Sequence, residues 1–252
     1  MTSQVIAVRS VQSGSGRTVI ASNLAFELAA VGKRVVLIDL DDQWPSVHRY
    51  FNLPQEKAAV LAATRLLEQG KLDANALEEL AVRLLAKGAS IDFLSGYGLN
   101  LNRDSINLQS IEAFLNHLAR RYDALVIDCS AGVSSRLLAT VQNVATQEVW
   151  VTQVDALSLG RFIELQPQIE ARPQVATEPL LVLNRMRSSV LGARPEWQVQ
   201  QVLRERTKFS RATVVPHDES LDSALLRGLP LRQLGGKSKA LAAIGELALR
   251  LQ

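Results

Sequence analysis

Residues Ser10-Val11-Gln12-Ser13-Gly14-Ser15-Gly16-Arg17-Thr18 form a glycine-rich stretch near the start of the chain. An apolar run of strand length, Val5–Val8, precedes this stretch, and a helical pattern from Thr18 to Ala30 follows it. A strand, a glycine-rich turn and a helix suit phosphate binding, because glycine lets the backbone approach an anion and the first helical N–H groups point at it. The stretch therefore predicts a phosphate-binding turn, with an ordinary strand-to-helix turn as the alternative.

The turn departs at two positions from the phosphate-loop pattern G-x-x-x-x-G-K-[ST]. Val11 stands at the first glycine position and Arg17 at the lysine position. We expect Gly14, Gly16 and the backbone amides through Thr18 to hold the phosphates of a nucleotide. Arg17 would supply positive charge, and the Thr18 hydroxyl would bind Mg²⁺. The dinucleotide-binding motif is excluded, because a valine stands at its third glycine position.

Apolar runs of strand length alternate with helical patterns along nearly the whole chain. Strands are expected at Gln4–Arg9, Arg34–Leu40, Ser90–Leu94, Ala124–Cys129, Glu148–Gln153, Leu180–Asn184 and Ala212–Val215. Helices are expected at Thr18–Val31, Lys57–Glu68, Ala74–Ala86, Leu108–Arg121, Ser134–Ala145, Leu159–Ala171, Glu196–Glu205, Ser220–Arg227 and Lys237–Leu251. Most strand runs are continuous, which is typical of strands covered on both faces. The pattern predicts an α/β fold, a three-layer, doubly wound and mostly parallel sheet, in one domain over residues 1–252.

The composition is that of a globular protein of ordinary charge. Of the residues, 47% are apolar and 21% are charged, as is usual for a soluble globular protein. The length of 252 residues is enough for one large domain with a sizeable core. The lone cysteine, Cys129, ends an apolar run and is expected to be buried, which suits a reducing cytosol. The sequence has no secretory signal and no apolar run long enough to span a bilayer, so a cytoplasmic location is predicted.

The net charge of +3 is unevenly distributed along the chain. From Asn184 to the end there are 12 basic and 6 acidic residues, against 16 basic and 19 acidic residues before it. A basic C-terminal third can meet non-specific DNA or an anionic membrane, and solvated helix faces are the alternative. The candidate DNA contacts are Arg204, Arg206, Lys208 and Arg211. The last helical pattern is amphipathic, and its apolar stripe predicts packing on the core rather than membrane binding.

Acidic residues follow two of the expected strands. Asp39 and Asp41 lie at the carboxyl end of the second strand, beside the glycine-rich turn in a parallel sheet. One carboxylate is expected to support the turn and the magnesium shell, and the other to orient an attacking water; a polar turn is the alternative. Asp128 follows four apolar residues, a Walker B-like layout that reaches Mg²⁺ through water. Trp44 comes directly after the first pair and either anchors a partner or packs against the next helix.

These motifs, in this order, resemble the ParA/MinD class of P-loop ATPases. The resemblance covers nearly the entire chain and rests on Gln12–Thr18, Asp39–Asp41, Asp128–Gly132, Leu183–Arg185, Val215–Asp218 and Arg227–Pro230. Within the class, residues Asp39–Leu53 are most similar to the CpaE/TadZ branch, which positions pilus machinery. The FlhG and BcsQ proteins are near relatives of that branch.

The resemblance implies that the chain binds ATP with Mg²⁺ and forms a homodimer with nucleotide between the subunits. It implies nucleotide contacts from Gln12, Ser13, Gly14, Ser15, Gly16, Arg17, Thr18, Val19, Asn184, Arg185, Pro216 and Asp218. It implies metal contacts from Thr18, Asp39 and Asp128. Asp41 matches the catalytic residue that orients the hydrolytic water. Asn184 matches the residue at the adenine edge, and Pro216–Asp218 match the loop that closes over the base.

Two departures from the class concern positive charge. Gln12 replaces the signature lysine that crosses the dimer to the partner's phosphates, and Arg17 replaces the usual loop lysine. Arginine keeps the charge but presents a planar fork instead of a compact ammonium. Phosphoryl transfer depends on positioning and charge stabilisation. We therefore expect weak or absent hydrolysis, with ATP binding retained.

These observations favour a dimeric, ATP-binding positioning or assembly factor for a pilus, secretion or envelope machine. A partner would recruit this cytoplasmic protein to the inner membrane or a cell pole. One alternative is a pseudo-ATPase scaffold that no longer binds nucleotide. The other is an active ParA-type ATPase that moves cargo on nucleoid DNA.

Overall fold

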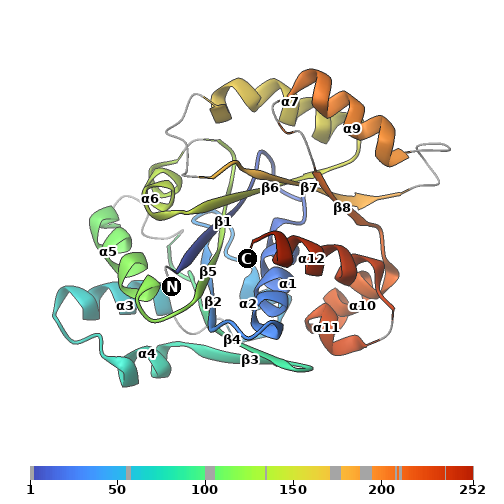
Figure 1. The fold of residues 1–252 in the computed structure, drawn as a ribbon. Coiled ribbons are helices and arrows are strands. Elements are labelled where there is room, and N and C mark those ends of the chain that lie inside the picture. The colour runs from blue at the N-terminus through green and yellow to red at the C-terminus, as the bar shows by residue number, and fades with distance from the viewer. Residues whose placement is uncertain are drawn as a thin grey trace.

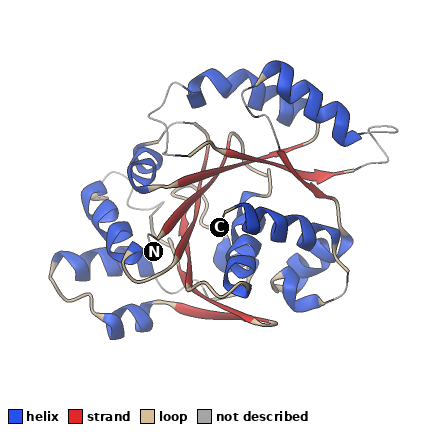
Figure 2. Ribbon diagram, in the orientation of Figure 1, coloured by secondary structure: helices blue, strands red, loops and turns tan. Residues whose placement is uncertain are grey.

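One eight-stranded sheet runs through the middle of the molecule, as the computed structural model shows (Figures 1 and 2). The structure describes residues 3–54, 58–99, 106–133, 135–170, 177–187, 195–207, 209, 212–235 and 237–251. In spatial order the strands are β3 (Val82–Ala86), β4 (Ala89–Leu94), β2 (Val35–Leu40), β5 (Ala124–Ala131), β1 (Gln4–Ser10), β6 (Gln147–Gln153), β7 (Leu180–Met186) and β8 (Ala212–Pro216). Every neighbouring pair is parallel except β3 and β4, which confirms the predicted mostly parallel sheet.

Helices cover both faces of this sheet (Figure 1). In chain order they are α1 (Arg17–Ala30), α2 (Val47–Tyr50), α3 (Ala59–Glu68), α4 (Ala74–Leu80), α5 (Leu108–Ala119), α6 (Arg136–Val144), α7 (Ala156–Glu170), α9 (Pro195–Arg206), α10 (Glu219–Arg227), α11 (Leu231–Leu234) and α12 (Lys239–Arg250). Helices α1 and α12 pack side by side on one face, and α3, α5, α6, α7 and α9 cover the other. The arrangement confirms the three-layer, doubly wound prediction.

The continuous apolar strands are explained by this double cover. Along β1, Ile6 and Val8 enter the core beneath α1 and α12, while Val5 and Ala7 enter the opposite core beneath α5 and α6. Since successive side chains of a strand point to opposite faces, both sets must be apolar when both faces are covered. The carboxyl ends of β1, β2 and β5 then meet at one edge, which is where the glycine-rich turn begins.

The predicted helix Ala74–Ala86 is wrong in its second half. Helix α4 ends at Leu80, and Val82–Ala86 form β3, which pairs antiparallel with β4. Leu84 is buried and Leu85 is 71% exposed, which is the alternation of a strand. Because both residues are leucine, with alanines nearby, this alternation does not appear in the sequence. A two-residue turn closes this hairpin, and Gly88 takes its left-handed position at a φ of 71°.

The remaining predicted elements are confirmed, apart from shifts at their ends. The starts predicted at Lys57 and Ser134 and the end predicted at Ala171 lie outside the described residues. The short helices α2 and α11 were not predicted. Ile244, Leu247 and Leu251 of the C-terminal segment are buried in the core, as the stripe predicted.

Cys129 on β5 is buried, as predicted, and burial raises the pKa of its thiol to about 12. Within the ranges that the structure describes, no helix has the length and apolar character needed to cross a bilayer.

Candidate functional site

The glycine-rich turn joins the end of β1 to the start of α1 at the carboxyl edge of the sheet. Gly14 and Gly16 have φ angles of 81° and 87°, which only glycine adopts without strain. Gly16 is the N-cap of α1, and no side chain among the described residues caps this helix. The first N–H groups of α1 are therefore available to an external acceptor, and the positive end of the helix dipole lies there too.

Strand β7 supports the turn through Asn184. The Asn184 amide Nδ2 donates to the Ser15 carbonyl at 2.9 Å, and its Oδ1 accepts from the Arg185 backbone N–H at 3.0 Å. A Cβ on Gly16 would lie 2.1 Å from Asn184 Nδ2, so a larger residue would displace the Asn184 side chain and also strain the backbone at its φ of 87°. The structure thus brings Asn184 to the predicted site, where its side chain braces the turn. The predicted contact with adenine stays a prediction.

Strand β6 and helix α7 hold the other side of the turn. Gln153 Nε2 donates to the Gly14 carbonyl at 2.5 Å, and Gln12 Nε2 donates to Ser158 Oγ at 2.6 Å. Gln12 is therefore hydrogen-bonded within its own chain, at the position where the class has a lysine that crosses the dimer. Gln153 and Ser158 were not singled out from the sequence.

Arg17 is turned toward the carboxylates of neighbouring strands. Its Nε donates to Asp128 Oδ1 at 2.8 Å, its Nη2 to Asp41 Oδ2 at 2.5 Å, and its Nη1 to Ser10 Oγ at 3.0 Å. The Arg17 residue is only 7% exposed. Burial by itself lowers the pKa of Arg17, but the charges of Asp128 and Asp41 outweigh burial and raise it above the usual value. The guanidinium is thus a buried, permanently charged link between β2, β5 and the turn.

Asp39 shapes the loop that follows β2. Its Oδ1 accepts from the Asp41 backbone N–H at 3.1 Å, and its Oδ2 accepts from those of Ser46 and Val47 at 2.9 and 3.0 Å. Burial, and after it the neighbouring Asp128, raise the pKa of Asp39 to about 8. The side chain is fully buried, so its role here is to fold residues 41–47 back over the strand end.

Asp41, the predicted catalytic residue, is held at both carboxylate oxygens. Its Oδ1 accepts from the backbone N–H groups of Gln43 and Trp44 at 2.9 and 3.0 Å, and its Oδ2 accepts from Arg17. Trp44 is 70% exposed, so it is not packed against the next helix, and the partner-anchor interpretation stays a prediction. Asp42 is linked to β5 because its backbone N–H donates to Ser130 Oγ at 3.0 Å.

The predicted metal ligands lie together, but their oxygens already have protein partners. Thr18 Oγ1 donates to Asp128 Oδ2 at 2.6 Å and lies 3.0 Å from Ser46 Oγ. Asp128 accepts from Arg17 at its other oxygen, and Asp39 accepts three backbone N–H groups. In the part of the chain that the structure describes, no group of three or more His, Cys, Asp or Glu side chains is arranged to hold a metal ion. Magnesium takes an octahedron of oxygens, several of them from water or phosphate, but the side-chain oxygens that would complete it here are paired with Arg17, with backbone N–H groups and with one another. As they stand, these residues do not fit the ion.

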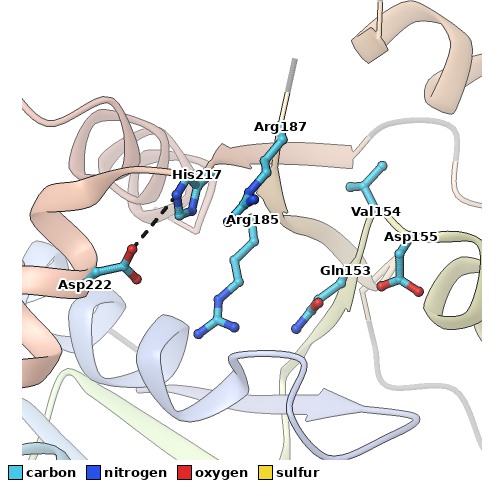
Figure 3. Close-up of a pocket in the computed structure, with 7 residues that line it drawn as sticks. All are labelled: Gln153, Val154, Asp155, Arg185, Arg187, His217 and Asp222. Atoms are coloured by element: carbon cyan, nitrogen blue, oxygen red, sulfur yellow. Dashed lines mark ion pairs between the residues drawn. The ribbon is translucent and has the colours of Figure 1, made fainter. Parts of the chain in front are cut away.

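A pocket of about 400 Å³ lies beside the turn, across the ends of β6, β7 and β8 (Figure 3). Its lining is Gln153, Val154, Asp155, Arg185, Arg187, His217 and Asp222. Figure 3 shows Arg185 between the His217–Asp222 pair and Gln153. The pair is loose, with 3.9 Å between His217 Nε2 and Asp222 Oδ2. Arg185 has a φ of 57°, a left-handed conformation that is uncommon for a residue with a side chain.

The sequence predicted Arg185 in this region and missed Gln153, Asp155, Arg187 and Asp222. Gln153 ends β6 and Asp155 lies two residues later, a polar strand end like those that singled out Asp39 and Asp128.

The loop Pro216–Asp218, which was predicted to close over the base, lines the pocket only through His217. Pro216 and Asp218 are not among the lining residues. Asp218 instead joins two helix starts. Its carboxylate accepts from the Ser220 and Ala240 backbone N–H groups at 2.9 and 3.0 Å. It also accepts from Ser238 Oγ at 2.8 Å. These hydrogen bonds oppose the effect of burial and hold the pKa of Asp218 well below its usual range.

A doubly wound sheet whose first strand leads through such a turn into a helix is typical of the P-loop class of proteins. Residues 3–170 match the AAA domain family. The putative septum site-determining protein MinD of Guillardia theta is 25% identical over 232 residues, which cover 90% of this chain and 80% of the relative. The chain belongs to the AAA domain family, as a member of the ParA/MinD class of P-loop ATPases.

Two solved structures share the fold. A ParA family ATPase from Chlorobium tepidum superposes with a TM-score of 0.79 at 19% identity, and 98% of each chain is covered. The septum site-determining protein MinD from Pyrococcus horikoshii, complexed with Mg-ADP, superposes with a TM-score of 0.74 at 18% identity, with 99% and 96% covered. At these identities the likeness concerns the fold alone.

The Arg17 ion pairs should contribute strongly to stability. Arg17→Ala leaves Asp41 and Asp128 buried without their counter-ion, and we expect the free energy of unfolding to fall by about 3–5 kcal/mol. Arg34→Ala is the matched control, because the Arg34–Asp123 pair is exposed and screened by water, so its loss should change stability little. Urea denaturation of both variants measures the difference. Equal losses would contradict a special role for the buried pairs.

The raised pKa of Asp39 predicts a pH dependence of stability. The folded state keeps a proton up to about pH 8 that the unfolded chain releases near its ordinary pKa of 3.8. The folded state therefore binds more protons in this window, and the free energy of unfolding should fall as pH rises through it. In Asp39→Asn, urea denaturation across this window should show a flatter pH slope.

Asp123→Asn is the control for that measurement, because Arg34 lowers the pKa of Asp123 to about 2, below the window. Its slope should match that of the unsubstituted protein. An unchanged slope in Asp39→Asn would assign the proton to another group.

Proposed function

We propose that this protein binds an adenine nucleotide, with its phosphates on the turn at residues 13–19 and its base in the pocket bordered by Arg185. The observation that carries the proposal is the uncapped start of α1 behind two glycines of positive φ, directly beside a pocket of about 400 Å³. The MinD structure from Pyrococcus horikoshii, which shares this fold and was solved with Mg-ADP, supports nucleotide binding.

Hydrolysis is proposed to be weak or absent. A catalytic carboxylate must turn an oxygen toward the attacking water, and here Arg17 and two backbone N–H groups hold both oxygens of Asp41. Phosphoryl transfer depends chiefly on positioning and on cationic groups that stabilise the negative charge of the transferred phosphoryl group. Arg17 directs its charge to carboxylates instead, and Gln12 is neutral and bound to Ser158.

The biological role that we propose is that of a dimeric positioning or assembly factor for a pilus, secretion or envelope machine. Its support is the sequence resemblance to the CpaE/TadZ branch, together with two exposed apolar side chains that follow strand ends at the nucleotide edge. Trp44 after β2 is 70% exposed, and Leu157 after β6 is 84% exposed. Large apolar groups at such an edge suit contact with a second subunit or a partner protein.

Transport of cargo on DNA is the second candidate, and it is favoured by the exposed Arg204 and Arg206 on α9. Lys208 and Arg211, the other predicted contacts, lie outside the described residues. A gel shift on non-specific DNA that weakens steeply with salt would support this candidate over the first.

Nucleotide binding is tested by isothermal titration with ATP and with ADP. We expect binding near micromolar, about −8 kcal/mol. Gly16→Ala should weaken binding at least about tenfold, because the new Cβ collides with Asn184 and distorts the turn. Gly70→Ala is the matched control. Gly70 has a φ of 67°, so its substitution strains the backbone in the same way, but a Cβ there meets nothing within 4 Å, so affinity should be retained.

An absence of heat and of thermal shift with either nucleotide would favour the pseudo-ATPase scaffold. Equal loss of binding in the two glycine variants would point to general destabilisation and not to the turn.

Asp41 is tested by its effect on any residual ATP turnover. Asp41→Ala should lower any residual turnover about 100-fold or more, because such turnover requires the Asp41 carboxylate to release Arg17 and orient water. ATP affinity should stay nearly unchanged, because the carboxylate is not expected to touch the phosphates. Asp42→Ala, which alters the neighbouring carboxylate, should keep its turnover. Release of phosphate and titration calorimetry measure the two quantities, and undiminished turnover in Asp41→Ala would remove Asp41 from the mechanism.

A further inference from the structure

We infer that Arg17 holds the place of the divalent cation in this site, so that nucleotide binds without Mg²⁺. This inference rests on the proposed nucleotide binding and concerns the chemistry of the same turn. Its starting point is the disagreement between the metal ligands predicted from the sequence and the partners that those ligands have in the structure.

Each acidic residue of the cluster accepts protein hydrogen bonds at both of its carboxylate oxygens. Asp128 accepts from Arg17 Nε at one oxygen and from the Thr18 hydroxyl at the other. Asp41 accepts two backbone N–H groups at Oδ1 and Arg17 Nη2 at Oδ2. Asp39 accepts one backbone N–H at Oδ1 and two at Oδ2. Each of these six carboxylate oxygens therefore has a protein donor.

The hydroxyl of Thr18 also has protein hydrogen-bond partners. Its one proton is directed to Asp128, and Ser46 Oγ lies 3.0 Å from its oxygen. A cation bound to this oxygen would have to compete with Ser46 for its lone pairs, beside a hydroxyl proton that is already held by Asp128. It would also approach a guanidinium that is itself fixed 2.5 to 2.8 Å from the two aspartates, and the two positive charges would repel in a site of low dielectric.

The shape of arginine makes this substitution possible. The guanidinium is a planar fork that donates in several directions at once, and here three of its nitrogens reach Asp128, Asp41 and Ser10. Lysine has a compact ammonium on a flexible stem, which suits a phosphate but does not span two carboxylates on neighbouring strands. With Arg17 so placed, the backbone N–H groups of the turn and the helix dipole are left to bind the phosphates.

The first test is titration calorimetry of ADP and ATP with the unsubstituted protein, in Mg²⁺ and in excess EDTA. We expect the two dissociation constants to agree within about threefold. Arg17→Lys should free the carboxylates, and its affinity should fall at least about tenfold on chelation. Arg34→Lys, the same exchange at an exposed position, should behave like the unsubstituted protein.

A loss of more than about threefold on chelation in the unsubstituted protein would overturn the inference and leave nucleotide binding intact. That comparison needs no variant, so it holds even if Arg17→Lys fails to fold.

The second test uses no nucleotide and follows thermal unfolding in millimolar MgCl₂. We expect no shift in Tm for the unsubstituted protein or Arg34→Lys, and a rise of a few degrees for Arg17→Lys. A rise in the unsubstituted protein would overturn the inference. If neither ADP nor ATP binds under any condition, the proposed function fails. The thermal-unfolding test then decides alone whether Arg17 occupies the place of Mg²⁺ among Asp41, Asp128 and Thr18.

Discussion

The buried contact of Arg17 with Asp41 and Asp128 connects the parts of this molecule that would handle a nucleotide. Arg17 opens α1, Asp41 follows β2, and Asp128 lies on β5, so one guanidinium joins the turn to two strand ends. Removing three charges from water is costly, and the cost is offset only because each carboxylate receives hydrogen bonds of good geometry. This dependence makes the cluster rigid: moving any one member leaves a buried charge without a partner.

The loop after β2 takes its shape from the same cluster. Asp39 receives the backbone N–H groups of Asp41, Ser46 and Val47, and Asp41 receives those of Gln43 and Trp44. The loop therefore closes around two acidic side chains, and Trp44 is left on its outer side, exposed to solvent. A ligand that drew Arg17 toward phosphate would withdraw the counter-ion from Asp41. The position of Arg17 and the position of Trp44 are thus physically linked.

Much of the fold and part of the site could be predicted from sequence, because both depend on local patterns. The strand ends that carry Asp39 and Asp128 follow from continuous apolar runs, and in a parallel sheet such ends share one edge. The hairpin of β3 and β4 was missed because Leu84, Leu85 and Ala86 have the composition of a helix. The direction of Arg17 could not be predicted either. The Arg17 side chain is long enough to reach either phosphates or carboxylates. Only the positions of the neighbouring strands decide which of them it contacts.

Retention of Asp39, Asp41 and Asp128 in a site without its usual lysines invites the interpretation that catalysis is retained. The contacts support a different reason. Asp128 and Asp41 are the counter-ions of a buried arginine, and Asp39 folds the adjoining loop, so each residue has a structural role that requires no reaction. Loss of any one would leave either the Arg17 charge or several buried N–H groups unpaired. Acidic residues at these positions therefore indicate an intact architecture, and turnover depends on whether Arg17 ever leaves them.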